Sequence, residues 1–115
     1  MSSKEQRRHP RFKVNRTGRI RIGDDAPSLT HLVNISEAGA ALFYSGPVAR
    51  DTAVELSFRL NIGTDAKPLL TLQGRVRHSE MRGHSYLLGI EFSNPPAQAI
   101  ETIRKFVDYN KLSAE

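Results

Sequence analysis

The feature that most limits how this chain can fold is the alternation of apolar and polar residues in short segments. In AVELSFRLNI (residues 53–62) every second residue is apolar. A period of two is that of a β-strand with one buried face. The same alternation, or a short apolar run of strand length, marks residues 17–23, 31–36, 39–45, 69–80 and 85–92. The sequence therefore predicts six short strands.

Turn-forming residues separate these segments. GDDAPS, SGPVARD, GTDAKP and MRGHS all carry Gly, Pro or Asp where the chain would reverse direction. Strands joined so closely pair antiparallel, and a small sheet that closes on itself leaves no exposed edge. The pattern predicts an all-β fold, a six-stranded antiparallel barrel.

The C-terminal segment has a different period. Ile100, Ile103, Phe106 and Val107 are spaced as on one face of a helix, and Asn94 precedes them as a candidate cap. We expect a helix over about residues 96–110 that packs on the barrel. The expected division is a flexible basic arm over residues 1–16 and a barrel with its C-terminal helix over residues 17–115.

Positive charge is concentrated at the N-terminus. Residues 1–21 hold eight Lys or Arg and one acid, whereas the remainder holds nine basic and eleven acidic residues. A cationic segment beside a nearly neutral body predicts an anionic partner that carries phosphate, such as a nucleotide, a nucleic acid or a lipid headgroup.

Several classes of protein are disfavoured. The 115 residues contain no Cys, no apolar signal-peptide core and no apolar stretch of membrane-spanning length. We expect a cytoplasmic, single-domain protein without membrane insertion. No motif for a nucleophile, a phosphate loop or a metal site is present, so we expect no enzymatic activity, no cofactor and no metal. His78 and His84 are expected to flank a hairpin turn as solvated side chains.

Two short motifs remain as candidate binding residues. Arg7, Arg8 and Arg11 form a cluster in which guanidinium groups could bind phosphate bidentately and stack on flat rings. Pro10 disfavours a helix there, so an extended or turn-like segment is expected. By itself the cluster is also compatible with a solvated basic tail.

The second motif is NISEAG, residues 34–39. Asn34 and Ser36 are two apart on a predicted strand and therefore share a face, with Val33 and Ile35 turned to the core. Their amide and hydroxyl groups could read the edge of a purine. Gly39 could supply a positive φ or let a flat ligand approach the backbone. An ordinary Asn-x-Ser turn would give the same letters.

Taken together, the two motifs closely resemble the PilZ domain family, whose members bind cyclic dimeric GMP (cyclic-di-GMP). RRHPR matches the family's Arg-x-x-x-Arg segment at Arg7 and Arg11, and NISEAG, which starts 23 residues after Arg11, matches its Asp/Asn-x-Ser-x-x-Gly motif. GRVRH and YLLGIEF resemble the last hairpin of the family's barrel. The resemblance covers about residues 6–110 and implies a six-stranded split barrel with a C-terminal helix.

The resemblance also implies roles for these residues. Arg7 and Arg11 would contact phosphates and guanines, with Arg8 beside them. Asn34 and Ser36 would bond a guanine edge, and Gly39 would leave room beside it. The arm would close over cyclic-di-GMP and present a new surface to a downstream protein. Gln6, which precedes the motif and carries no charge, favours one ligand molecule over two.

Two alternatives remain open from the sequence. Small basic barrels also bind single-stranded nucleic acid, although only Phe12 among the aromatic residues lies in the cationic segment. A PilZ-type barrel could also act only as a protein-docking module, for which members without the arginines are the better candidates.

Overall fold

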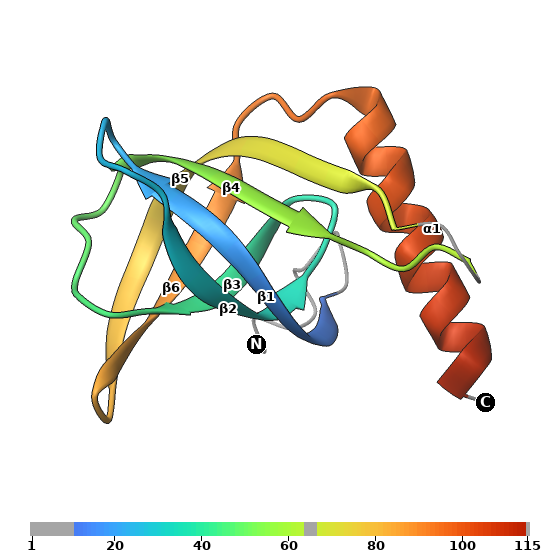
Figure 1. The fold of residues 1–115 in the computed structure, drawn as a ribbon, viewed down its shortest axis with the longest axis horizontal. Helices are drawn as coiled ribbons and strands as arrows, with labels where there is room; N and C mark the ends of the chain where they lie inside the picture. Colours follow the sequence, from blue (N-terminus) through green and yellow to red (C-terminus); the bar gives the residue numbers. More distant parts are fainter. Residues whose placement is uncertain (1–10, 64–66, 115) are drawn as a thin grey trace, which may run out of the picture.

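The computed structural model describes residues 11–63 and 67–114. Within these ranges the chain forms six strands and one helix, in the order β1 (Phe12–Ile22), β2 (Ser28–Ile35), β3 (Gly39–Tyr44), β4 (Ala53–Arg59), β5 (Leu69–Arg82), β6 (Ser85–Phe92) and α1 (Ala97–Ala114). All paired strands are antiparallel, and the sheet closes in the order β1-β2-β3-β6-β5-β4 (Figure 1). The predicted all-β barrel with a C-terminal helix is confirmed.

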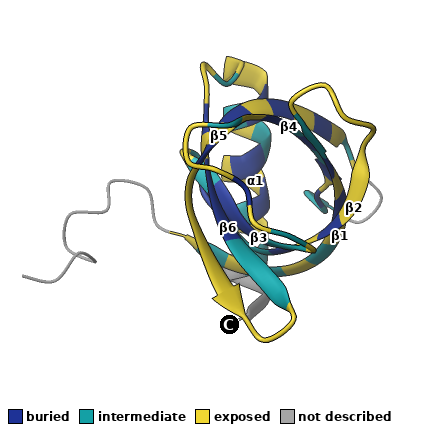
Figure 2. Cartoon of the chain, turned by 90° about the vertical axis from the view of Figure 1, so that its left-hand side faces the viewer, coloured by how far each residue is buried: buried dark blue, intermediate teal, exposed yellow. Residues whose placement is uncertain are grey.

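The alternating residues fill the barrel. Figure 2 looks along its axis, with buried and exposed residues alternating along the wall. Fully burying one such side chain contributes about 1.5–3 kcal/mol, so this core provides the main stabilisation of the fold. The largest fully buried side chains are Ile20, Leu32, Ile35, Leu42, Leu56, Phe58, Leu60, Leu72, Val76, Leu88 and Ile103.

The alternation is interrupted in β2. The register of β2 with β3 shifts between Leu32 and Asn34, so β2 carries one extra residue there. A bulge of this kind turns the following side chains to the other face. Leu32 and Ile35 are therefore both fully buried, while Val33 is only half-buried. The expectation that Val33 and Ile35 both face the core is wrong for Val33.

The first strand starts earlier than the predicted boundary at residue 17. β1 begins at Phe12, whose ring packs edge-to-face against Phe106 of α1, with centroids 5.7 Å apart and planes at 88°. β1 therefore includes residues 12–16, which the expected division assigned to the arm. Residues 1–10, which include Arg7 and Arg8, lie outside the described residues.

Helix α1 closes one end of the barrel, as the two perpendicular views show (Figures 1 and 2). Its buried residues include Ala99, Ile103 and Phe106. The helix runs from Ala97 to Ala114, past the expected end near residue 110. Asn110 donates a side-chain hydrogen bond to the carbonyl oxygen of Phe106 (2.8 Å), one turn earlier. Among the described residues, no helix combines the length and apolar character that a membrane span requires.

Candidate functional site

A pocket of about 360 Å³ opens on the outer wall of the barrel where β3, β6 and β5 lie side by side. Its volume is within the usual range for small-molecule sites, about 300–1,000 Å³. The residues that line it are Arg11, Ser36, Ala38, Gly39, Ala40, Arg77, His78, Gly89, Ile90 and Glu91. We call residues 36–39 the loop wall, and residues 77–78 with 89–91 the strand wall.

The loop wall is shaped by Ser36. Its hydroxyl oxygen accepts hydrogen bonds from the backbone N–H groups of Ala38 (3.1 Å) and Gly39 (3.2 Å). The Ser36 N–H in turn donates to the carbonyl oxygen of Gly39 at 2.8 Å. Ser36 is 5% exposed, so without its hydroxyl these N–H groups would lose a partner in a largely dry place. Ser36 therefore has a structural role in the turn, which agrees with the ordinary turn that the sequence left open as an alternative.

The close approach of strand β6 leaves room only for a glycine at position 39. A Cβ at this position would lie 2.1 Å from the carbonyl oxygen of Ile90, much closer than real Cβ atoms come. Gly39 is not among the residues with positive φ, so that sequence-based option is wrong. The close backbone approach of β3 to β6 explains the glycine and also keeps this side of the pocket open.

Asn34 lies apart from the other motif residues. It pairs with Lys13 of β1 and Ala41 of β3 and is not one of the residues that line the pocket. Its side-chain oxygen Oδ1 is buried and has no hydrogen-bond partner among the described residues. Leaving a buried acceptor without a partner lowers the stability of the fold by about 1–3 kcal/mol. Asn34 Oδ1 is therefore free to accept a hydrogen bond from a ligand.

Arg11 brings positive charge to the pocket. It directly precedes β1, is exposed, and lines the pocket together with Ser36 and Gly39. The fold thus brings together three of the six residues that the sequence selected. The register of β1 on β2 accounts for this meeting, since Phe12 pairs with Ile35 and the two motifs adjoin those residues.

The strand wall carries an arginine that the sequence analysis missed. Arg77 is the extra residue of a bulge between Val76 and His78 in β5. Its Nε and Nη2 donate to Glu91 Oε1 at 2.9 and 2.5 Å, and its Nη1 donates to Asp51 Oδ1 at 2.6 Å. The hydrogen bond with Glu91, followed by the charge of that carboxylate, raises the pKa of Arg77. The guanidinium is held at the pocket's edge and stays charged.

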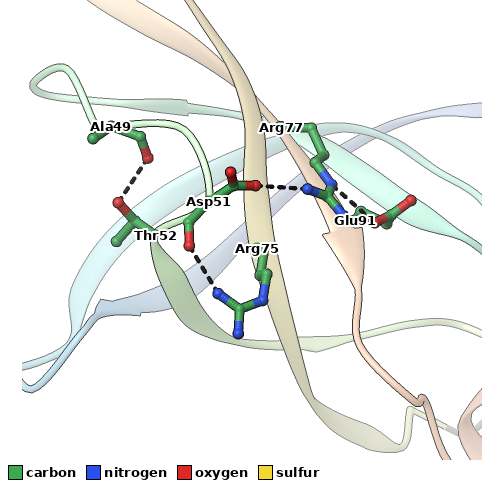
Figure 3. A network of polar contacts seen from close by, with 6 residues as sticks. All are labelled: Ala49, Asp51, Thr52, Arg75, Arg77 and Glu91. Carbon is green, nitrogen blue, oxygen red and sulfur yellow. Dashed lines mark hydrogen bonds and ion pairs between the residues drawn. The ribbon is translucent and has the colours of Figure 1, made fainter.

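Asp51 connects this edge to the loop between β3 and β4 (Figure 3). It has a φ of 72°, and its carbonyl oxygen accepts from Arg75 Nη1 at 2.9 Å. Its N–H donates to the carbonyl oxygen of Val76 at 2.7 Å, so both backbone polar groups of Asp51 are bonded to residues of β5. Thr52 closes the same turn by donating to the carbonyl oxygen of Ala49 at 2.6 Å.

His78 also differs from its expected position. It lies within β5 opposite Gly89 of β6, whereas the hairpin turn itself is at Gly83 and His84. The imidazole fills the place that a side chain at residue 89 would take, since ring atoms stand 2.2–2.7 Å from an ideal Cβ there. The bulge at Arg77 and the glycine opposite, Gly89, determine where the His78 ring lies. The sequence analysis identified the segment YLLGIEF that contains this glycine, but it did not identify the bulge.

The loop wall is also linked to the helix. Arg104 of α1 donates through Nη2 to Glu37 Oε1 at 2.8 Å and through Nε to Oε2 at 3.3 Å. The bond to Glu37 raises the pKa of Arg104. Among the described residues, no group of three or more His, Asp or Glu side chains could hold a metal ion.

A comparison with family models identifies the family of this chain. The sequence matches the PilZ domain over residues 5–109. None of the curated proteins matches the chain. Solved structures at 11–20% identity show the same fold.

Three of these structures illustrate the range. The inhibitor of motility MotI/DgrA of Bacillus subtilis has a TM-score of 0.79 and 16% identity, over 93% of this chain and 52% of that one. The PilZ domain of Escherichia coli YcgR with c-di-GMP gives 0.73 and 11%, over 94% of each chain. The K. pneumonia MrkH–c-di-GMP complex gives 0.71 and 20%, over 94% of this chain and 53% of that one. The chain thus spans about half the length of MotI/DgrA and MrkH.

Proposed function

Because the chain belongs to the PilZ domain family, we propose that it is a receptor for cyclic-di-GMP. The ligand would occupy the pocket between the loop wall and the strand wall. The proposed ligand-binding residues are Arg7, Arg8, Arg11, Asn34, Ser36 and Gly39. The response would be ligand binding and ordering of the N-terminal segment rather than a chemical reaction.

The observation that carries this proposal is that Arg11 lines one pocket with Ser36 and Gly39. A guanidinium is a planar fork that suits phosphate oxygens and can also stack on a flat base. Cyclic-di-GMP offers both groups. Ile90 and Ala40 supply an apolar floor, which is typical of small-molecule sites with a few polar anchors.

The polar groups of the loop divide into two kinds under this proposal. The Ser36 hydroxyl holds the turn that forms the pocket's side, and any bond to a guanine would be added to that role. Asn34 Oδ1 has an open capacity to accept from a guanine N–H group. Because that atom is buried, such a bond requires its side chain to move outward toward the ligand.

The energetics permit useful affinity. Closing the segment that carries Arg7 and Arg8 costs conformational entropy. Hydrogen bonds to charged groups contribute about 1.5–3 kcal/mol each, and a micromolar dissociation constant needs only about 8 kcal/mol net. We expect micromolar or tighter binding of one ligand molecule, weakened by salt because part of the attraction is between charges.

The closed segment and the ligand would together form a surface for a downstream protein. A contact with that surface would pass on the signal that the ligand is bound.

Titration calorimetry tests the proposal. Cyclic-di-GMP is added to the purified protein, with GTP, cyclic GMP and a single-stranded oligonucleotide as controls. We expect saturable binding of cyclic-di-GMP alone, and no measurable binding by Arg7→Ala or Arg11→Ala variants with unchanged thermal unfolding. Wild-type affinity in both variants would refute the role of the arginines, and preference for the oligonucleotide would favour a nucleic-acid barrel.

A further inference from the structure

We propose that two copies of this chain associate through the edge of β5, at the end of the hairpin that β5 forms with β6. The surface lies outside the ligand pocket, so this inference does not depend on the proposed function. Three observations support it: an unpaired stretch of β5, an exposed apolar side chain on that stretch, and charges that a second copy would complement.

The unpaired stretch arises because β5 extends beyond its neighbour β4. β4 pairs with β5 only as far as Arg75, and the loop before β4 bonds to β5 at Val76. Residues 79–82 pair with β6 on one side and with no other strand of the described chain. Figures 1 and 2 show this hairpin extending past the ring of strands. We call residues 79–82 the open edge.

The backbone of the open edge can accept another strand. In an antiparallel ladder, the N–H and C=O groups of alternate residues point to opposite sides of the strand. Arg82 pairs with Ser85 beside the two-residue turn, so Ser79 and Met81 direct these groups away from β6. An unpaired row of this kind is a template for pairing with another chain. The open edge contains neither Lys nor Pro, which protect many natural edges.

Met81 supplies the apolar part of this surface. Its side chain is 66% exposed, although it is one of the large apolar residues of the chain. A second Met81 packed beside it would remove apolar surface of both side chains from water, at about 25 cal/mol per Å². Methionine suits such a contact, because its unbranched side chain adapts to the shape of its neighbour.

The charges of the open edge indicate that its occupant is a second copy. Glu80 and Arg82 flank Met81 and form an ion pair of 2.5 Å within the chain. If two copies pair antiparallel with Met81 opposite Met81, each Glu80 lies opposite the Arg82 of the other copy, where opposite charges attract. A partner strand with charges of one sign would attract one of these residues and repel the other. The order acid, apolar, base is complemented by its own reverse.

The expected dimer is weak and two-fold symmetric, with the same edge used by both copies. Four residues from each chain are far fewer than the roughly 20–30 residues a side of a standard interface. The association should therefore depend on concentration, and a covalent trap is the most sensitive way to detect it.

The chain contains no Cys, so Met81→Cys introduces a single thiol. Residues opposite each other in an antiparallel pair have Cα atoms about 4.5–5.5 Å apart, which a disulfide can bridge. The full chain is incubated with oxidised glutathione at several protein concentrations, and the linked dimer is measured by non-reducing electrophoresis. His84→Cys is the matched control, since His84 is exposed on the same hairpin. In the proposed register the two copies of residue 84 are six positions apart, or roughly 20 Å.

We expect Met81→Cys to give about fivefold or more linked dimer than His84→Cys, in a fraction that rises with concentration. Glu80→Arg or Arg82→Glu, each added to Met81→Cys, places like charges opposite each other and should lower linkage to the control level. Mixing these two charge variants places Arg opposite Glu again and should restore linkage between them. Each chain in the mixture keeps its altered charges, so this restoration cannot come from the ion pair within one hairpin.

Equal linkage in Met81→Cys and His84→Cys would overturn the proposal. Linkage that ignores the charge changes would also overturn it, because random collision would then explain the dimer. So would a failure of the mixture to restore linkage, because the charges would then act only within one chain. Thermal unfolding identifies the temperature at which every variant is folded, and the comparison is made there. None of these results would affect the cyclic-di-GMP proposal, which calorimetry tests separately.

Discussion

The two walls of the pocket are built in different ways. In the loop wall, the hydrogen bonds that shape the backbone join Ser36 to residues two or three positions away. In the strand wall, Arg77 is bonded to residues 14 and 26 positions away, and His78 lies on a glycine of the next strand. The turn of the loop wall depends on residues that are neighbours in the sequence. The strand wall forms only when β5 and β6 are correctly paired and the loop between β3 and β4 lies against β5.

The largest effect is expected where the two walls meet, at Gly39. In Gly39→Ala, the new Cβ would lie 2.1 Å from the Ile90 carbonyl oxygen, and both belong to paired strands that cannot separate without breaking hydrogen bonds. We expect the free energy of unfolding to fall by about 3 kcal/mol, the upper part of the range for overpacking. Urea unfolding measures it.

Gly46→Ala is the matched control, since nothing lies within 4 Å of a Cβ at Gly46. Equal stability of the two variants would show that β3 and β6 can separate easily. The claim that the Ile90 carbonyl requires a glycine at position 39 would then be wrong.

The next effect concerns Ser36. Ser36→Ala leaves the N–H groups of Ala38 and Gly39 without the hydroxyl that accepts from them, and we expect a loss of about 2 kcal/mol in stability. The affinity for cyclic-di-GMP should fall by about 1 kcal/mol or more, as for one lost hydrogen bond. Urea unfolding and calorimetry report the two effects separately.

Ser57→Ala provides the comparison for an exposed hydroxyl, because Ser57 shares a single exposed hydrogen bond with Thr71. We expect a much smaller change in stability there. If Ser36→Ala were as mild as Ser57→Ala, the loop wall would not depend on the serine.

These contrasts also explain what the sequence could predict. The period-two segments and the helical spacing predicted the barrel and α1 because side-chain burial follows directly from those periods. The turn residues predicted where the strands end. Arg11, Ser36 and Gly39 were found because their spacing resembles a family motif, and the fold brings them to one pocket.

Bulges account for most of what was missed. One extra residue in β2 turned Val33 away from the core, and another in β5 placed Arg77 and His78 on the pocket. A bulge depends on the register between two strands, and the sequence of one strand alone does not determine that register. Asp51 was missed because it lies in the loop between β3 and β4 and its partners, Val76 and Arg77, are on β5, more than twenty residues later.

A smaller effect is expected for the charges of the strand wall. Arg77, Asp51 and Glu91 are all exposed, and exposed ion pairs contribute little because water screens them. Asp51→Gly should leave stability nearly unchanged, since glycine relieves the cost of a φ of 72° while the ion pair is lost. Asp51→Ala should be the less stable of the two. Both variants lose the ion pair, so the reverse order in thermal unfolding would mean that the positive φ carries no cost for a side chain at this position.

The smallest effect is expected on β4, at Glu55. Hydrogen bonds from Gln73 and then Arg21 lower the pKa of this carboxylate. The carboxylate therefore stabilises the fold above the ordinary glutamate pKa of about 4.3, and this contribution disappears as the pH falls through the lowered value. Without the Gln73 hydrogen bond the pKa of Glu55 is lowered less, so the Gln73→Ala variant should lose less stability than the wild type as the pH falls through that acidic range. An identical pH profile for the variant in thermal unfolding would contradict the assignment.

The central claim is that the pocket between the two walls is where cyclic-di-GMP binds, and nuclear magnetic resonance of the isotope-labelled protein tests it most directly. Adding cyclic-di-GMP should shift the amide signals of residues 36–40, 77–78 and 89–91 most strongly. The signals of Leu29 and Leu69, exposed on another part of the barrel, should barely move. No shift at all, or shifts gathered around Leu29 and Leu69, would contradict the account.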